Sequence, residues 1–278
     1  MMIGANFPDI DILSAPFGRA TEFRRGWTHG VLALVVLPFV LTGLMMLWDR
    51  YRRRGRTPAI PRQLLLLATI SIWTHPTLDW MNSYGLRWLM PFDGTWFYGD
   101  SLFIVDPYLL VLLGTGVWLS RRREKENAPN PWKPARIAVA VSSLYIALML
   151  GAQEIAENAA QSRLAGTDIA REKLVVTASP GNPLKWRVHA DNGSLYSQGR
   201  VDLLTRDLQM DRGGLEKGLD NPLVLSAIKN ESAAAFLDWA RLPFYRIEQT
   251  ESGAAVRVTD ARYGASILIP VLPPRPRG

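Results

Sequence analysis

An uncharged run of 18 residues, Val31 to Trp48, constrains this chain more than any other feature. That length is about the minimum for a helix that crosses the hydrocarbon core of a bilayer, where backbone polar groups must be satisfied inside the segment. Three further apolar stretches follow along the chain. The sequence therefore predicts four membrane spans, at about residues 29–48, 63–80, 103–120 and 137–153.

Basic residues are concentrated in two of the loops that join these stretches. Six arginines lie between residues 49 and 62 and six basic residues between 121 and 136, whereas the loop at 81–102 contains only Arg87. Cytoplasmic loops of membrane proteins carry the excess of Lys and Arg. Arg19, Arg24 and Arg25 precede the first stretch and count against this orientation, but three against six leaves it favoured. We expect the loop at 81–102 and both chain ends to face outward.

The pattern changes after Arg163, where shorter alternating runs replace the long apolar stretches. Asn192-Gly193 lies between two alternating runs, which is a hairpin signal, and the segment from Leu223 to Trp239 has helical spacing. Further strands are expected near residues 173–177, 245–248, 255–258 and 266–269. The predicted fold is an α-helical multi-span membrane domain at 1–163, followed by a small α+β extramembrane domain at 164–278.

Composition narrows the possible functions. The net charge is +7 with an isoelectric point near 9.9, but the basic residues are grouped between apolar runs, so membrane topology explains them and nucleic-acid binding is disfavoured. Membrane lipid is the expected partner. The chain has no cysteine, which excludes disulfides and thiolate metal sites. Residues 1–20 lack the pattern of a cleaved signal peptide, so we expect the first span to act as the targeting signal.

The predicted topology brings several metal-binding side chains to the outer membrane face. Two histidines and up to five carboxylates lie at the outer ends of the spans: His29, His75, Asp79, Asp100, Asp106, Asp9 and Asp11. If the helix continues through Pro76, His75 and Asp79 share one face because they are four residues apart. Neutral imidazoles with carboxylates suit Zn²⁺, with Mn²⁺ or Fe²⁺ as alternatives, and a water on such an ion is a nucleophile near neutral pH.

Each of these residues also has a plainer interpretation. His75 can be an interfacial histidine that is hydrogen-bonded to Asp79, and His29 can cap a helix. Asp106 precedes Pro107, so it reads equally well as the N-cap of the third span. His189 lies in an expected strand and is more easily explained as a structural residue.

Three stretches resemble the bacterial inner-membrane metal-dependent hydrolase family, long catalogued as a domain of unknown function: residues 23–30, 75–85, and 96–100 with 104–107. Residues 236–239 and 258–263 are similar to the extramembrane part of its longer members. The resemblance implies a multi-pass protein of the bacterial inner membrane, with a metal site and a hydrolase activity. Together with the predicted topology, it leads us to expect a periplasmic or extracytoplasmic C-terminal domain. It implies the metal ligands His29, His75, Asp79, Asp9 and Asp11, followed by Asp100 and Asp106.

The chain departs from this family in two places. Members usually begin with a further apolar segment that carries a Thr-His pair, whereas this sequence starts at Met1, shortly before Pro8. Many members also have histidine at the position of Arg24. For the missing Thr-His pair, either the start of the sequence is misassigned or truncated, or this protein has lost a ligand. Arginine at position 24 leaves the expected site still poorer in imidazole.

The leading hypothesis is a membrane-bound hydrolase in which metal-activated water attacks an ester or phosphoester, with a lipid or envelope component as the candidate substrate. Its metal candidates are His29, His75, Asp79, Asp9, Asp11 and Asp106, and its candidate catalytic carboxylates are Asp79 and Asp100. The alternative is a non-catalytic membrane scaffold in which the His/Asp cluster is structural. A transporter is disfavoured, since charges in mid-span and an internal repeat are both missing from the sequence.

Overall fold

The computed structural model describes residues 2–17, 25–52, 57–167, 174–250, 253–264 and 266–270. It divides into two compact units, Met1–Gly99 and Asp100–Gly278, and each is described by itself. Several residues used above lie outside the described ranges, namely Arg19, Arg24, three arginines of the first basic loop and the C-terminal tail. The predicted boundary between a membrane and an extramembrane domain at 163–164 stays a prediction.

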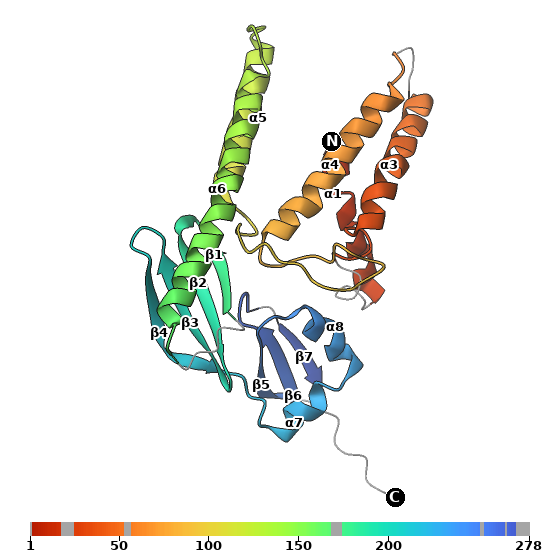
Figure 1. The fold of residues 1–278 in the computed structure, drawn as a ribbon. Helices are drawn as coiled ribbons and strands as arrows, with labels where there is room; N and C mark the ends of the chain where they lie inside the picture. Colours follow the sequence, from red (N-terminus) through yellow and green to blue (C-terminus); the bar gives the residue numbers. More distant parts are fainter. Residues whose placement is uncertain are drawn as a thin grey trace, which may run out of the picture. The chain divides into compact units, whose positions relative to one another are not determined.

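The first unit contains two long helices that run side by side, α3 (Val31–Arg52) and α4 (Pro61–Met81) (Figure 1). They pack through Leu34 and Leu41 of α3 and Ala68 and Ile72 of α4. The short helix α1 (Met2–Asn6) and the 3-10 helix η1 (Pro8–Phe17) precede them. Contacts of α1 and η1 with α4 bring the N-terminal segment to the helix that carries His75.

A proline inside α3 helps to join the two helices. Pro38 has no N–H, so the carbonyl of Leu34, one turn earlier, loses its usual helical donor. The indole Nε1 of Trp73 in α4 donates to this carbonyl at 3.0 Å. The gap in the hydrogen bonding of α3 is thereby filled from α4, two residues before His75.

The second unit begins with a helical hairpin, α5 (Pro107–Lys125) and α6 (Lys133–Leu164) (Figure 1). The two helices approach closely at Gly116, where an added Cβ would lie 2.3 Å from the Cβ of Ala138. The Ser120 hydroxyl also accepts from the Ala135 amide at 2.9 Å, which satisfies one of the free N–H groups at the start of α6. Small residues at such contacts are typical of helices that pack within a membrane.

Two of the four helices, α3 and α6, are long and apolar enough to cross a membrane. Only 28% and 17% of their most apolar windows are buried, so both leave wide apolar faces uncovered. Helices α4 and α5 form where spans were expected, but within the described ranges neither meets the same criterion, since α4 contains Arg62, His75 and Asp79 and α5 ends in basic residues. The predicted helical region is confirmed, and the four-span arrangement stays a prediction.

The rest of the second unit contains two antiparallel sheets. The first has the order β1-β2-β3-β4, formed by β1 (Leu174–Ser179), β2 (Asn182–Asn192), β3 (Leu195–Asp202) and β4 (Asp207–Glu216). The C-terminal part of α6 packs on this sheet (Figure 1). The second sheet has the order β5-β6-β7, formed by β5 (Pro243–Thr250), β6 (Gly253–Asp260) and β7 (Ser266–Pro270).

Most local predictions for this region agree with the structure. The predicted hairpin turn at Asn192-Gly193 joins β2 to β3, and Gly193 has the positive φ of 71° that such a turn requires. The helix expected from Leu223 to Trp239 is instead two short helices, α7 (Pro222–Ala227) and α8 (Glu231–Trp239). The side chain of Asn221 caps α7 by accepting from the Leu223 amide, and Pro222 occupies the first helical position.

Cationic side chains lie around the buried His189 of β2. Its imidazole is 5% exposed, and neither ring nitrogen has a hydrogen-bond partner among the described residues. Burial, followed by the positive charges of Arg187, Arg262 and Arg241 and only partly offset by Asp260, lowers the pKa of His189 to about 4. The ring is therefore neutral in the folded protein at neutral pH.

This depressed pKa predicts a loss of stability in weak acid. The unfolded chain binds a proton at His189 below about pH 6.5, whereas the folded chain does so only near pH 4. The free energy of unfolding is therefore unaffected by His189 above pH 6.5 and falls as the pH drops towards 4. We expect the wild type to lose up to about 3 kcal/mol more than His189→Gln over that interval. Chemical denaturation of the full chain in detergent at several pH values, followed by β-sheet circular dichroism, measures the difference. The same dependence of unfolding free energy on pH in the wild type and in His189→Gln would contradict this prediction.

Candidate metal centre

Four of the predicted ligands lie together in the first unit. Asp9 comes from η1, His29 from the turn before α3, and His75 and Asp79 from α4, and one ligand atom of each lies within 4.8 Å of the others. Nε2 of His75 lies 3.4 Å from Oδ2 of Asp79 and 3.4 Å from Oδ1 of Asp9. Nε2 of His29 lies 3.6 and 3.7 Å from the same two oxygens.

The local backbone explains why these side chains meet. Helix α4 continues through Pro76 to Met81, so His75 and Asp79 stand one turn apart on the same face. His29 is held by a turn in which its amide and that of Gly30 both donate to the carbonyl of Gly26. Gly30 packs against the chain at Met90, whose carbonyl oxygen would lie 2.4 Å from an added Cβ. A side chain at position 30 would therefore displace the segment that carries His29.

Three of the four ligand atoms are buried and have no hydrogen bond to any residue that the structure describes: Nε2 of His29, Nε2 of His75 and Oδ2 of Asp79. Leaving such atoms unpaired in a protein interior costs about 1–3 kcal/mol each, and more for a charged group. A divalent cation would satisfy all three at once, because two imidazoles and one carboxylate form a common ligand set for Zn²⁺ and for Fe²⁺. The residues present therefore fit a metal ion.

Arg25 fixes the second oxygen of Asp79. Its Nη2 donates to Oδ1 of Asp79 at 2.8 Å, its Nη1 reaches Gly85 O and Asn82 Oδ1, and the guanidinium lies 4.4 Å from the centre of the Tyr84 ring. This leaves Oδ2 as the oxygen that faces the two histidines. From the sequence, Arg25 is expected only to bear on membrane topology, and its contact with Asp79 is not predicted. The other partners of Arg25, namely Asn82, Tyr84 and Gly85, lie in the polar run after Asp79. This run was the signal in the sequence for a buried polar network.

Asp11 and Thr28 set the orientation of His29. The Thr28 hydroxyl donates to Oδ2 of Asp11 at 3.2 Å and lies 3.0 Å from Nδ1 of His29. Because a hydroxyl has one proton and an ionised carboxylate can only accept, the hydroxyl oxygen must accept from Nδ1–H. In the neutral imidazole, this network assigns the proton to Nδ1 and leaves a lone pair on Nε2, which faces the cluster. Oδ2 of Asp11 lies 3.5 Å from Nδ1 of His29, and Asp11 is not among the four clustered residues, so its role as a metal ligand stays a prediction.

Asp9 is the most exposed member of the cluster, with half of its side chain accessible. Interaction with the neighbouring imidazole of His75 lowers the pKa of Asp9, and His29 contributes in the same direction. The Asp9 carboxylate is therefore ionised at neutral pH and open to solvent.

Asp100 and Asp106 belong to the second unit and are paired there. Oδ2 of Asp100 accepts from Nη1 of Arg241 at 2.6 Å. Oδ1 of Asp106 accepts from the first amides of α5, and its Oδ2 accepts from the Tyr145 hydroxyl at 2.9 Å. Asp106 is therefore the N-cap that the Asp-Pro sequence also suggested. The ligand role of Asp106 and the catalytic role of Asp100 stay predictions.

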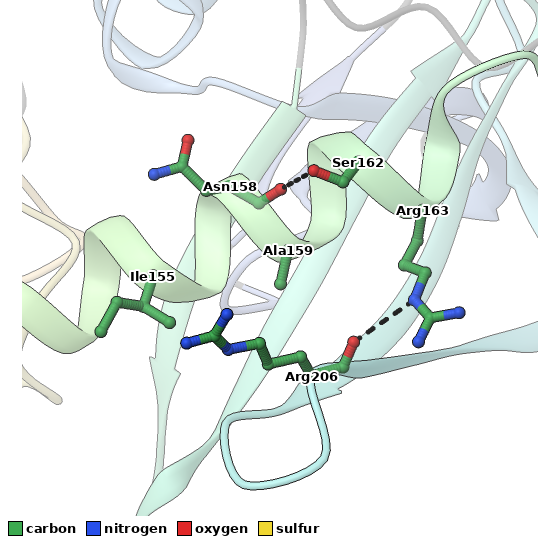
Figure 2. A pocket seen from close by; sticks show the side chains of 6 residues that line it. All are labelled: Ile155, Asn158, Ala159, Ser162, Arg163 and Arg206. Carbon is green, nitrogen blue, oxygen red and sulfur yellow. Dashed lines mark hydrogen bonds between the residues drawn. The ribbon is translucent and has the colours of Figure 1, made fainter.

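A pocket in the second unit has a different chemistry. It lies between the C-terminal part of α6 and the turn after β3, and its lining consists of Ile155, Asn158, Ala159, Ser162, Arg163 and Arg206 (Figure 2). Nε of Arg163 donates to the Arg206 carbonyl at 3.4 Å. The lining has no carboxylate or imidazole side chain, so this pocket does not offer the ligands that a divalent metal requires.

The contact between Thr28 and His29 predicts a measurable effect on metal affinity. Thr28→Val keeps the shape of the side chain but removes the hydroxyl that holds Nδ1–H, so we expect metal affinity to fall by about 10–100-fold. Thr28→Ser retains the hydroxyl and should bind nearly as tightly as the wild type. Competition with a fluorescent zinc chelator, using purified protein in detergent, measures both. Equal affinities for the valine and serine variants would show that the hydroxyl does not orient His29.

Comparison with known proteins places this cluster in a family context. A family model described as "YdjM inner membrane protein" matches residues 1–156, which is more than half of the chain and includes all the clustered side chains. No curated protein and no solved structure matches the chain. The family match and the two long apolar helices together indicate a location in the membrane. The chain therefore belongs to the YdjM inner membrane protein family.

Proposed function

We propose that this protein is a metal-dependent hydrolase of the inner membrane that cleaves an ester or phosphoester, with His29, His75 and Asp79 as metal ligands. The observation that carries the proposal is that three buried ligand atoms lie within 4.8 Å of one another and have no hydrogen bond within the described part of the chain. The resemblance of the surrounding stretches to a metal-dependent hydrolase family is further support. A divalent metal supplies Lewis acidity and lowers the pKa of a bound water towards neutrality.

The residues around the cluster have separate tasks in this proposal. The lone pairs of His29 and His75 and one oxygen of Asp79 hold the cation, while Arg25 and the Asp11–Thr28 pair keep these ligands oriented. Asp79 is a ligand rather than a general base, because Arg25 engages its other oxygen. Asp9 is ionised and half exposed, so it is the carboxylate placed to take up a proton from water at the open side of the cluster.

The proposed substrate class is an ester or phosphoester of a lipid or envelope component. The cluster lies near the C-terminal end of α4 and the N-terminal end of α3, and α3 is long and apolar enough to cross the bilayer. A site near the end of such a helix would lie near the membrane surface, within reach of the ester and phosphate groups of lipids.

Metal content of the purified chain tests the ligand set. We expect His29→Ala and His75→Ala to lose bound metal, because each removes one of three donors. His189→Ala is the matched control, since it removes the third histidine of the chain at a buried site in the second unit. Elemental analysis of detergent-purified protein measures the metal content of the wild type and the three variants. Equal metal content in every preparation would contradict the metal site.

Hydrolysis is tested separately with Asp9→Asn. This variant should keep metal, because Asp9 accepts a proton rather than binding the ion in this proposal, and lose most hydrolysis of a panel of chromogenic carboxyl esters, phosphomonoesters and phosphodiesters. If metal-binding wild type hydrolyses nothing, and metal-free His75→Ala still restores the phenotype of a deletion strain, the cluster is structural. That outcome would favour the scaffold alternative.

We also propose that α3, α4, α5 and α6 all cross the membrane and that the two sheets lie on the periplasmic side. The support is the alternation of basic residues, six between residues 49 and 62, one between 81 and 102 and six between 121 and 136. In this arrangement the loop between α5 and α6 is cytoplasmic. The less apolar helix α4 would cross beside α3, and the less apolar α5 would cross beside α6, so neither would be alone in lipid.

The cysteine-free sequence allows a direct test of this topology. Single cysteines are introduced by Leu204→Cys in the turn after β3 and Glu126→Cys at the end of α5, where both side chains are exposed. We expect an impermeant maleimide to label Leu204→Cys in intact spheroplasts, and to label Glu126→Cys only after lysis. The reverse pattern would place the sheets in the cytoplasm.

A further inference from the structure

A groove runs between α5 and α6 near the loop that joins them. It has a volume of about 650 Å³, and its walls include Leu112 and Leu119 of α5 and Ile137 and Val141 of α6. Two basic side chains, Arg123 and Lys133, line the same groove towards the loop. The groove therefore combines an apolar channel with a cationic end.

Arg123 is held in place but is not satisfied. Its Nη2 donates to the Pro129 carbonyl at 2.8 Å, which fixes the guanidinium against the loop. Its Nε is buried and has no hydrogen-bond partner among the residues that the structure describes. A buried guanidinium N–H without an acceptor is costly, and phosphate oxygens are among its strongest partners. Among the described residues, no ion pair is formed by Arg123 or Lys133, so this end of the groove is cationic.

The apolar walls are also uncovered. Val111, Ile137 and Val141 line the groove and are 66%, 52% and 41% exposed. Helix α6 is long and apolar enough to cross the bilayer, so hydrocarbon chains are the neighbours that such a surface would meet. A second protein helix could cover the apolar walls, but its side chains would not supply a phosphate to Arg123. The charge at one end favours an amphiphile with an anionic head.

We propose that this groove is a binding site for an anionic phospholipid, with one acyl chain between α5 and α6 and the phosphate at Arg123 and Lys133. Basic pockets between membrane helices are suited to such headgroups. The basic loop places the headgroup in the cytoplasmic leaflet, if the proposed topology holds. The site is separate from the metal cluster and does not depend on hydrolase activity.

Lipid titration of the purified full chain tests the proposal. Native mass spectrometry in a neutral detergent compares phosphatidylglycerol with phosphatidylcholine, and the wild type should retain phosphatidylglycerol preferentially. Arg123→Gln combined with Lys133→Gln should weaken that binding by about tenfold or more, as expected for the loss of two basic contacts with an anionic lipid. Arg122→Gln combined with Arg136→Gln is the matched control, because it removes the same charge from exposed positions that do not line the groove.

A second variant tests the acyl-chain part without a change in charge. Val141→Trp fills the groove and should also reduce phosphatidylglycerol retention, so the proposal remains testable if the double variant does not fold.

Four results would contradict the proposal. Equal losses of phosphatidylglycerol binding in the two double variants would mean only diffuse attraction to the basic loop. Unchanged lipid binding in the groove variants would exclude the site. Displacement of the lipid by millimolar inorganic phosphate would indicate a free-anion site. Conversion of a dimer to a monomer by Val141→Trp, with lipid binding unchanged, would assign the groove to a second copy of the chain.

Discussion

The first unit depends on one carboxylate whose two oxygens have different partners. One oxygen of Asp79 binds Arg25, which also reaches the backbone of Gly85, and the other faces His29 and His75. The negative charge is therefore shared between a fixed guanidinium and the imidazole cluster. Through this arrangement the turn before α3, the end of α4 and the loop after α4 become one connected structure. Removing Asp79 would leave Arg25 and two histidines without the charge that holds them together.

The second unit solves a different physical problem. Its hairpin of α5 and α6 exposes apolar side chains along most of its length, whereas its sheets bury a conventional core and a charged pair, Asp260 and Arg262. That pair is almost fully buried, and the guanidinium also lies over the rings of Trp239 and Tyr263. One chain thus contains a part suited to lipid and a part suited to water. Helix α6 belongs to both, because its C-terminal end packs on the first sheet.

Much of this could be predicted from the sequence because the signals were local and repeated. Long apolar runs indicated the helices, Asp106-Pro107 indicated a capped start, and Asn192-Gly193 indicated a hairpin. The grouping of Asp9, His29, His75 and Asp79 was also predicted, from topology and from a family resemblance. The roles of Arg25 and Thr28 could not be predicted, because they depend on which atom of a neighbour each one meets. The break between α7 and α8 was missed since helical spacing continues across it.

The hydrogen bond from Trp73 to the Leu34 carbonyl has a consequence for the mechanics of the first unit. A proline gap occurs at one place along α3, so only one longitudinal alignment of α3 and α4 gives the indole an acceptor that lacks its helical donor. Sliding one helix past the other by a turn would leave the carbonyl unpaired in an apolar environment. The hydrogen bond therefore fixes the longitudinal alignment of α3 and α4 close to His75. If α3 and α4 both cross the membrane, as in the proposed topology, changes in bilayer thickness are better accommodated by tilting the pair as a rigid body than by shearing the cluster of histidines and carboxylates apart.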